Sequence, residues 1–121
     1  MINTKASIII LNWNTSADTI ECIDSLKNQT EKNFEVIVVD NASEPEDVNK
    51  LKEYCAKEKF LKIQLILNRE NIGFTGGNNS ALKPAKGEIV VSLNNDAVAE
   101  SEWLEKLLEP FSDPLVGGTG S

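Results

Sequence analysis

Asparagine, aspartate and glycine residues gather at four points of this sequence, and each group follows directly after a short apolar run. Nine of the thirteen asparagines lie in these groups or at the helix start that follows the third one, whereas the loops before the runs, such as 28–33 and 57–62, are charged connectors. Turn formation by Asn and Asp does not explain this difference, so the pattern predicts a site for a polar small molecule. The groups are Asn12, Trp13 and Asn14; Asp40, Asn41 and Ser43; Asn68, Asn71, Gly73, Gly76 and Gly77; and Asn94, Asn95 and Asp96.

Asp96 is the clearest candidate for a metal ligand. It follows the strand predicted at Glu88–Asn94, and its neighbours are carboxamides, with no His or Cys beside it. One carboxylate among carboxamide oxygens suits Mg²⁺ or Mn²⁺ shared with the phosphates of a substrate. The alternative is that Asp96 only begins a turn toward a helix at Ser101, and the spacing alone favours neither interpretation.

Asp40 and Trp13 suggest recognition of a nucleoside. A carboxylate at a strand end can accept hydrogen bonds from a nucleobase or from ribose hydroxyls, and an indole ring can stack on a base. Each has a structural alternative. Asp40 can cap the loop that leads into the helix after Ser43, and Trp13 can cover the end of the sheet by packing.

The glycine-rich segment Asn68–Gly77 matches neither of two common phosphate-binding motifs. No Gly-Lys-Ser/Thr is present, which excludes a P-loop. A dinucleotide-binding fingerprint needs glycines directly after the first strand, where this chain has Asn-Trp-Asn-Thr-Ser. Gly73, Gly76 and Gly77 could instead let backbone approach a ligand ahead of a helix, or could form only a tight loop.

The amino-acid composition excludes several classes of catalytic site and partner. The 121 residues contain 12 Lys and Arg, 19 Asp and Glu and no His, which gives a net charge of −7. The absence of His excludes Ser-His-Asp catalysis and the usual zinc ligand sets within this chain. The negative charge argues against nucleic acid as a partner. Cys22 and Cys55 form no metal or redox motif and are expected to pack in the interior.

No targeting or membrane signal is visible in the sequence. No unbroken apolar run approaches the roughly 18 residues of a spanning helix. The segment Met1–Ser7 has neither a basic region nor a long apolar stretch before a cleavage site. We expect a cytoplasmic protein without a membrane segment in this chain.

Strand and helix patterns alternate along the chain. β-branched runs predict strands, and apolar residues at helical spacing predict the helices between them. Thr15 or Ser16 is expected to cap the first helix, and Ser43 with Glu46 the second. The predicted strands are Ser7–Asn12, Phe34–Asp40, Ile63–Leu67 and Glu88–Asn94; the predicted helices are Ala17–Asn28, a helix after Ser43 containing Val48, Leu51 and Cys55, Asn78–Ala85, and Ser101–Glu109; a further strand could begin at Leu115–Val116.

This alternation without hairpins predicts an α/β fold: an open, mostly parallel sheet with helices on both faces, in one domain over residues 1–121. In such a sheet, ligands bind beyond the carboxyl ends of the strands. All four polar groups fall at those ends. We therefore expect the ligand site there.

The same positions resemble a known family. SIIILNWN, VIVVDNAS, NRENIGFTGGNNSAL and KGEIVVSLNND, in this order over residues 7 to about 104, are similar to the amino-terminal half of family 2 glycosyltransferases, which have the Rossmann-like GT-A fold. The stretch with Asn71, Gly73, Phe74, Gly77, Asn78 and Asn79 is especially similar to a rhamnosyltransferase-like branch, and the resemblance implies that the segment Asn71–Asn79 lines the donor pocket. The resemblance implies a strand order of 3-2-1-4.

The resemblance also implies site roles. Asn95 matches the first acid of the family's Asp-x-Asp motif, which contacts ribose, and Asp96 matches the acid that binds Mg²⁺ or Mn²⁺ at the diphosphate. The reaction would be metal-assisted transfer of a sugar from a nucleotide-diphospho-sugar to a saccharide or other hydroxyl acceptor. The donor-binding residues implied are Leu11, Asn12, Trp13, Asn14, Asp40, Asn41, Asn71, Gly73, Phe74, Asn79, Asn94 and Asn95.

Two departures from the family pattern affect this interpretation. The acid motif is reduced to Asn94-Asn95-Asp96, so a single strong metal ligand remains. The family's later half, with its acceptor site and catalytic base, has no counterpart in this sequence, and we assign no catalytic residue.

Three functions therefore stay open. The chain is the donor-binding half of a glycosyltransferase, a non-catalytic nucleotide-binding module that self-associates through exposed sheet surface, or a relative of the sugar nucleotidyltransferases. The last is disfavoured because Leu11–Ser16 contains neither Gly nor a basic residue.

Overall fold

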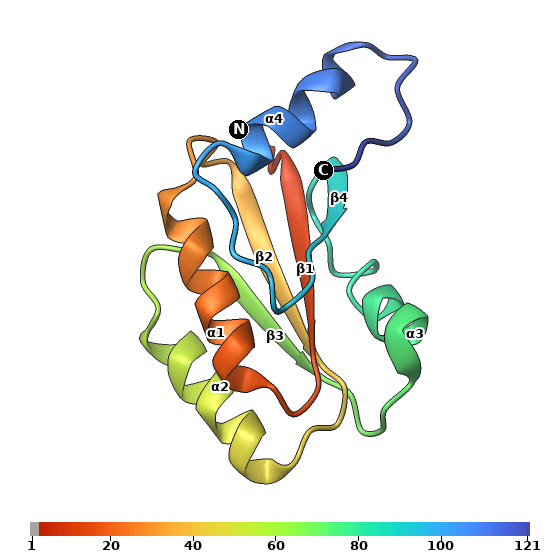
Figure 1. Ribbon diagram of the computed structural model, residues 1–121. Helices are drawn as coiled ribbons and strands as arrows, with labels where there is room; N and C mark the ends of the chain where they lie inside the picture. The colour runs from red at the N-terminus through yellow and green to blue at the C-terminus, as the bar shows by residue number, and fades with distance from the viewer. Residues whose placement is uncertain (1–2) are drawn as a thin grey trace.

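The computed structural model describes residues 3–121, in which strands and helices alternate along the chain (Figure 1). The strands are β1 (Ala6–Asn12), β2 (Phe34–Asp40), β3 (Ile63–Leu67) and β4 (Ile89–Ser92). The α-helices are α1 (Ser16–Ser25), α2 (Pro45–Lys57), α3 (Gly73–Asn79) and α4 (Trp103–Leu108), and short 3₁₀ helices follow α1 at Leu26–Asn28 and α4 at Glu109–Ser112. No helix among residues 3–121 is long and apolar enough to span a membrane.

The four strands form one sheet in the order β3-β2-β1-β4, and every neighbouring pair is parallel. This confirms the predicted sheet and its order. The register places Asn12 directly opposite Asp40. Partners in a parallel ladder point to the same face of the sheet, so these two polar side chains are brought together at the carboxyl ends of the central strands.

Helices cover both faces of the sheet, as predicted. Ile8, Ile10, Val36 and Val38 of one face pack with buried residues of α1, α2 and α4 in the larger core. The opposite face carries Ile9, Ile37 and Val39, which pack against Ala81 in the turns after α3. In Figure 1, α1 and α2 lie side by side on one face, and α3 stands apart from them beside β1.

The third helix differs from its prediction. The sequence predicts a loop through Gly77 and a helix over Asn78–Ala85, but α3 occupies Gly73–Asn79 and gives way to turns at Ser80. The reason is a close approach of backbone to β1. A Cβ on Gly77 would lie 2.5 Å from Leu11 Cδ1, so glycine at this point lets α3 lie directly against the strand.

The predicted helix caps are confirmed only in the position of Thr15 before α1. Ser43 and Glu46 form no capping box, because α2 begins at Pro45 and the Ser43 hydroxyl donates to Asp40 Oδ1 instead, at 2.7 Å. Thr15 holds the N-cap position of α1 without a side-chain cap bond. The N–H of Ser16 donates to Asp47 Oδ1 at 3.0 Å, so a residue of α2 accepts a hydrogen bond from the first backbone N–H of α1.

The remaining differences concern element ends and the tail. β4 is shorter than the predicted Glu88–Asn94, α1 ends at Ser25 rather than Asn28, and α4 ends at Leu108 rather than Glu109. The strand expected at Leu115–Val116 is absent, and the N–H of Val116 donates to the carbonyl of Asp113 in a turn. Both cysteines are free thiols. Cys22 is buried and Cys55 half-buried.

Candidate functional site

A cleft of about 340 Å³ opens where β1 and β4 end beside α3. The strands deliver their last residues to this edge, and α3 forms the opposite side. Six residues that the sequence predicts for the site line it, namely Leu11, Trp13, Phe74, Asn94, Asn95 and Asp96. Four further residues line it: Thr15, Ser92 and Leu93, which were not predicted for the site, and Asn78, which was expected there only as part of the segment Asn71–Asn79. Asn78 carried a signal, since it belongs to the same asparagine-rich stretch as Asn79.

Two aromatic rings line the cleft from different segments. Trp13 follows β1 and is 54% exposed, and Phe74 lies in the first turn of α3 and is 63% exposed. Neither ring is buried in the core, so Trp13 does not serve mainly to cover the end of the sheet by packing. Flat apolar faces of this kind can stack on a planar ligand.

Asp96 lies in a backbone turn on the β4 side of the cleft. The N–H of Ala97 donates to the carbonyl of Asn94 at 3.1 Å, which closes the turn without help from the aspartate side chain. Asp96 is exposed, and within residues 3–121 its carboxylate takes part in no hydrogen bond or ion pair. It is therefore the unengaged acid of the cleft.

The donor set around Asp96 is restricted. The described part of the chain holds no group of three His, Cys, Asp or Glu residues arranged to bind a metal ion. One carboxylate, with amide oxygens at Asn94 and Asn95 nearby in sequence, fits a hard cation that takes its other ligands from water and phosphate, as Mg²⁺ commonly does.

Asn95 ties this turn to the beginning of α1. Its carboxamide nitrogen donates to Thr15 Oγ1 at 2.7 Å and to Thr19 Oγ1 at 3.1 Å. Thr19 in turn donates to Asn12 Oδ1 at 2.6 Å. The segment that carries Asp96 is thus connected to the sheet through a helix.

Asn12 is the centre of a buried polar network beneath the cleft. Its carboxamide nitrogen donates to Asp40 Oδ1 at 2.9 Å and to Asp47 Oδ2 at 3.0 Å, and it also lies 3.3 Å from Ser43 Oγ. Asp40 is 1% exposed, and its other oxygen accepts the N–H of Ser43. Burial opposes ionisation of Asp47, but the bonds from Asn12 and Ser16 outweigh it and lower the pKa of that carboxyl.

Asn41 is likewise the centre of a hydrogen-bond network, which involves the glycine-rich segment. It is buried at the end of β2, donates to Asn71 Oδ1 at 3.1 Å and to the carbonyl of Gly73 at 3.0 Å, and accepts the N–H of Ile72. The carboxamide nitrogen of Asn68 donates to Asn41 Oδ1 at 3.2 Å. These bonds hold the start of α3 against the sheet, where Gly73 adopts a φ of +80°.

Seven predicted site residues therefore lie outside the cleft lining. Asn12, Asp40, Asn41 and Asn71 belong to the hydrogen-bond networks that support the cleft. Asn14 accepts the N–H of Glu44 at 2.8 Å and has a φ of 55°. Gly73 and Asn79 are exposed at the two ends of α3.

Comparison with known proteins identifies the family to which this arrangement corresponds. The sequence profile described as Glycosyl transferase family 2 matches residues 7–120. The amylovoran biosynthesis glycosyltransferase AmsB of Erwinia amylovora is 34% identical over 111 residues, which cover 90% of this chain and 35% of that protein.

Solved structures agree with this match. The mannosyltransferase PcManGT from Pyrobaculum calidifontis, in complex with GDP-Man and Mn²⁺, superimposes with a TM-score of 0.87 at 27% identity, over 97% of this chain and 35% of that one. Residues 1–349 of S. aureus TarS in complex with UDP-GlcNAc give a TM-score of 0.76 at 27% identity, over 97% of this chain and 36% of that one. This chain thus spans about a third of the length of these relatives.

Proposed function

Because this chain belongs to glycosyl transferase family 2, we propose that it binds the donor of a sugar transfer, a nucleoside diphosphate sugar, in the cleft between β1, β4 and α3. One observation carries the proposal. Exposed aromatic rings at Trp13 and Phe74 share a single cleft with the unengaged carboxylate of Asp96. The aromatic rings can stack on a planar base, and the carboxylate can hold a divalent cation that binds the diphosphate.

Asp96 is the residue we assign to a divalent cation. A cation is needed because the chain carries a net charge of −7, and the lining of the cleft contains no Lys or Arg to meet a diphosphate. Mg²⁺ or Mn²⁺ at Asp96 would supply Lewis-acid stabilisation of the diphosphate leaving group. The structural relative PcManGT is described with Mn²⁺, which supports this choice of cation.

The other predicted donor residues fall into two roles. Leu11, Trp13, Phe74, Asn94 and Asn95 line the cleft and are placed against the donor. Asn12, Asn14, Asp40, Asn41, Asn71, Gly73 and Asn79 are assigned to the site as the residues that shape it. We assign no catalytic residue to this chain.

For the donor sugar and the acceptor, the proposal names only a chemical class. A rhamnosyl donor is favoured only by the sequence of Asn71–Asn79, while the relatives named above are described with GDP-Man and UDP-GlcNAc. The acceptor is a saccharide or other hydroxyl compound. Residues 1–121 are then a single donor-binding domain, and its cytoplasmic location stays a prediction from the sequence.

Isothermal titration calorimetry tests this function directly. UDP and GDP are titrated into the protein with Mn²⁺, with Mg²⁺ and with EDTA, and we expect weak binding that strengthens with the cation. The Asp96→Ala variant should lose the dependence on the cation. Glu53→Ala, which removes an exposed carboxylate from α2, is the matched control and should behave as the wild type.

Two results would contradict the proposal. If neither nucleotide binds at millimolar concentration with either cation, the cleft is not a donor site. If Asp96→Ala binds nucleotide with unchanged dependence on the cation, the role of Asp96 is wrong even though the cleft is right.

A further inference from the structure

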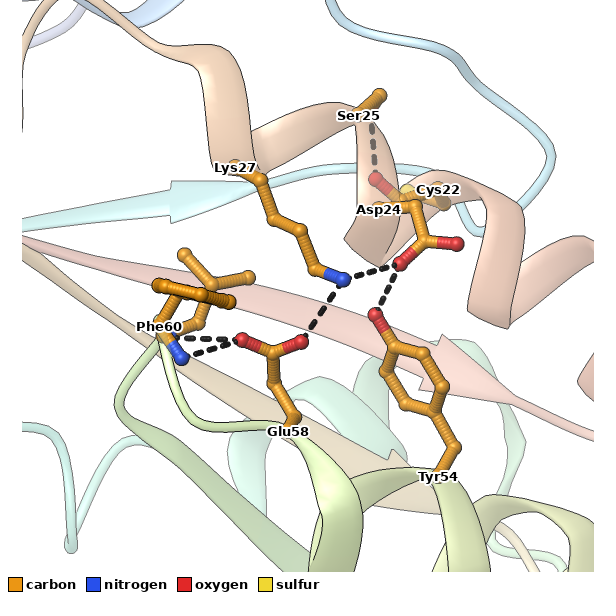
Figure 2. A network of polar contacts seen from close by, with 8 residues as sticks. Cys22, Asp24, Ser25, Lys27, Tyr54, Glu58 and Phe60 are labelled. Carbon is orange, nitrogen blue, oxygen red and sulfur yellow. Dashed lines mark hydrogen bonds and ion pairs between the residues drawn. The ribbon is translucent and has the colours of Figure 1, made fainter.

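The turn between α2 and β3 projects a phenylalanine into solvent. Phe60 is 88% exposed, although the turn that carries it is held by specific bonds. Glu58 Oε2 accepts the N–H of Phe60 at 2.7 Å and that of Leu61 at 2.9 Å (Figure 2). The ring is therefore presented by an ordered turn rather than left at a loose end.

Lys27 of the 3₁₀ helix after α1 locks this turn from the other side. Its ammonium lies 2.9 Å from Glu58 Oε1 and 3.0 Å from Asp24 Oδ1, and the Tyr54 hydroxyl donates to the same oxygen of Asp24 (Figure 2). The bond from Lys27 lowers the pKa of Glu58, whose side chain is only 4% exposed. The charge of Glu58, two residues before Phe60, is thus paired within the chain.

Several lysines lie near Phe60 in the sequence or line a hollow together with it. Lys57, Lys59 and Lys62 flank it in sequence, and Lys32 joins Lys62 in lining an adjacent hollow of about 580 Å³ that also includes Phe60. These four lysines are exposed, and none forms an ion pair with another residue in the range 3–121. A positively charged surface with an aromatic centre stands out on a chain of net charge −7.

A second hollow on the same chain has the opposite character. It has a volume of about 660 Å³ and is lined by apolar side chains at Ile89, Leu108 and Phe111. The acids that line it are Glu31, Glu88, Glu102, Glu105 and Glu109. Lys5 pairs with Glu31 and Lys106 with Glu102, and the other three acids have no ion-pair partner among the residues described.

We propose that the chain self-associates, with Phe60 of one copy seated in the acidic hollow of a second copy and its flanking lysines against the glutamates there. The apolar lining suits the ring, and the charges of the two surfaces are complementary. An anionic bilayer fits less well, because the acidic hollow would be held close to it.

The positions of the two surfaces favour a closed dimer. The lining of the hollow beside Phe60 includes Phe34, the first residue of β2, and that of the acidic hollow includes Ile89, the first residue of β4, so both hollows border the amino ends of the strands. Two copies related by a two-fold axis can therefore make the contact twice. The donor cleft lies at the opposite, carboxyl edge of the sheet and stays open, so the inference does not depend on donor binding.

Sedimentation velocity from micromolar to millimolar protein, at low and at high salt, measures the association. We expect a dimer that weakens with salt. Phe60→Ser should weaken it by about tenfold, and the fold is checked by circular dichroism. Lys52→Glu, an exposed charge reversal elsewhere on α2, is the control and should leave the dimer intact.

Charge exchange gives the sharpest test. The double variants Lys59→Glu/Lys62→Glu and Glu105→Lys/Glu109→Lys should each be monomeric, because every copy then carries one mismatched surface. A mixture of the two should associate again, because both contacts of the mixed pair are complementary.

The proposal is overturned if the wild type is monomeric throughout, or if the mixed variants fail to associate while each is folded. It is equally overturned if the protein stays monomeric and binds vesicles of anionic phospholipid through Phe60, since the surface then serves a bilayer.

Discussion

The carboxamide nitrogen of Asn95 lies 3.1 Å from the hydroxyl oxygen of Thr19 and donates a hydrogen bond to it. The hydroxyl of Thr19 already donates a hydrogen bond to Asn12 Oδ1 at 2.6 Å. The hydroxyl can therefore only accept from residue 95, and a carboxylate there would have no proton to offer. This explains, in local terms, an amide at the position where the family resemblance implies an acid.

Asn95→Asp should consequently destabilise the fold. It removes two donated bonds and sets a carboxylate against a hydroxyl oxygen, which we expect to lower the free energy of unfolding by about 1–2 kcal/mol. Urea denaturation measures the change. The matched control is Asn94→Asp, an exposed neighbour, and a loss of equal size there would show that the Thr19 bond is not responsible.

Asn12→Ala should be more damaging, because it withdraws the shared donor from two carboxylates in the network beneath the cleft. Asp40 is 1% exposed and would lose that bond without gaining water. We expect a loss of about 2–4 kcal/mol in the free energy of unfolding. Asn79→Ala at the exposed end of α3 should change it by less than about 0.5 kcal/mol, and similar losses in both variants would contradict the network's role.

Gly77→Ala should force the side chain of Leu11, or α3 itself, to shift. The new Cβ would meet Leu11 Cδ1 at 2.5 Å and Asn41 Nδ2 at 3.1 Å. Overpacking of this kind costs about 1–3 kcal/mol, and thermal unfolding followed by circular dichroism would detect it. Gly118→Ala meets nothing within 4 Å and should be neutral. A Gly77→Ala protein as stable as the wild type would mean that α3 does not need this close approach.

Glu58 should make stability depend on pH. The bond from Lys27 lowers the pKa of Glu58 from its ordinary value of 4.5 in the folded state. Its contribution is therefore present above that value and is lost as the pH falls through the folded pKa. Glu58→Gln should lose about 1 kcal/mol at neutral pH, and this loss relative to the wild type should shrink as the pH falls through the folded pKa of Glu58. Urea titrations at neutral and at acidic pH measure this, with Glu53→Gln on exposed α2 as the control. A difference that persists at the lower pH would contradict the ionic origin.

The sheet could be predicted because its signal is local. β2 and β3 begin and end at the predicted residues, since β-branched runs bounded by turn residues need no distant partner to be recognised. The register of β1 and β2 then follows from strand order, and it brings Asn12 and Asp40 together.

The misses have a common physical origin in distant contacts. The glycines of α3 lower its local helix propensity, and its backbone at Gly77 lies close to the side chain of Leu11, more than sixty residues away, a contact that local propensity does not include. Ser43 fails as a cap because Asp40 and the N–H of Asn14 engage its hydroxyl. The bonds of Asp40 to Asn12 and Ser43 likewise depend on the folded register, while its role toward a ligand stays a prediction.

The composition of α3 has a consequence for how the cleft behaves in time. Three of its seven residues are glycine, and each glycine disfavours a helix by roughly 0.5–1 kcal/mol relative to alanine. The amides of Phe74 to Asn79 should therefore exchange with deuterium sooner than those of the central strands. A ligand that contacts Phe74 and Asn78 would suppress the local unfolding of α3. Slower deuterium exchange of the α3 amides would therefore indicate that the cleft is occupied.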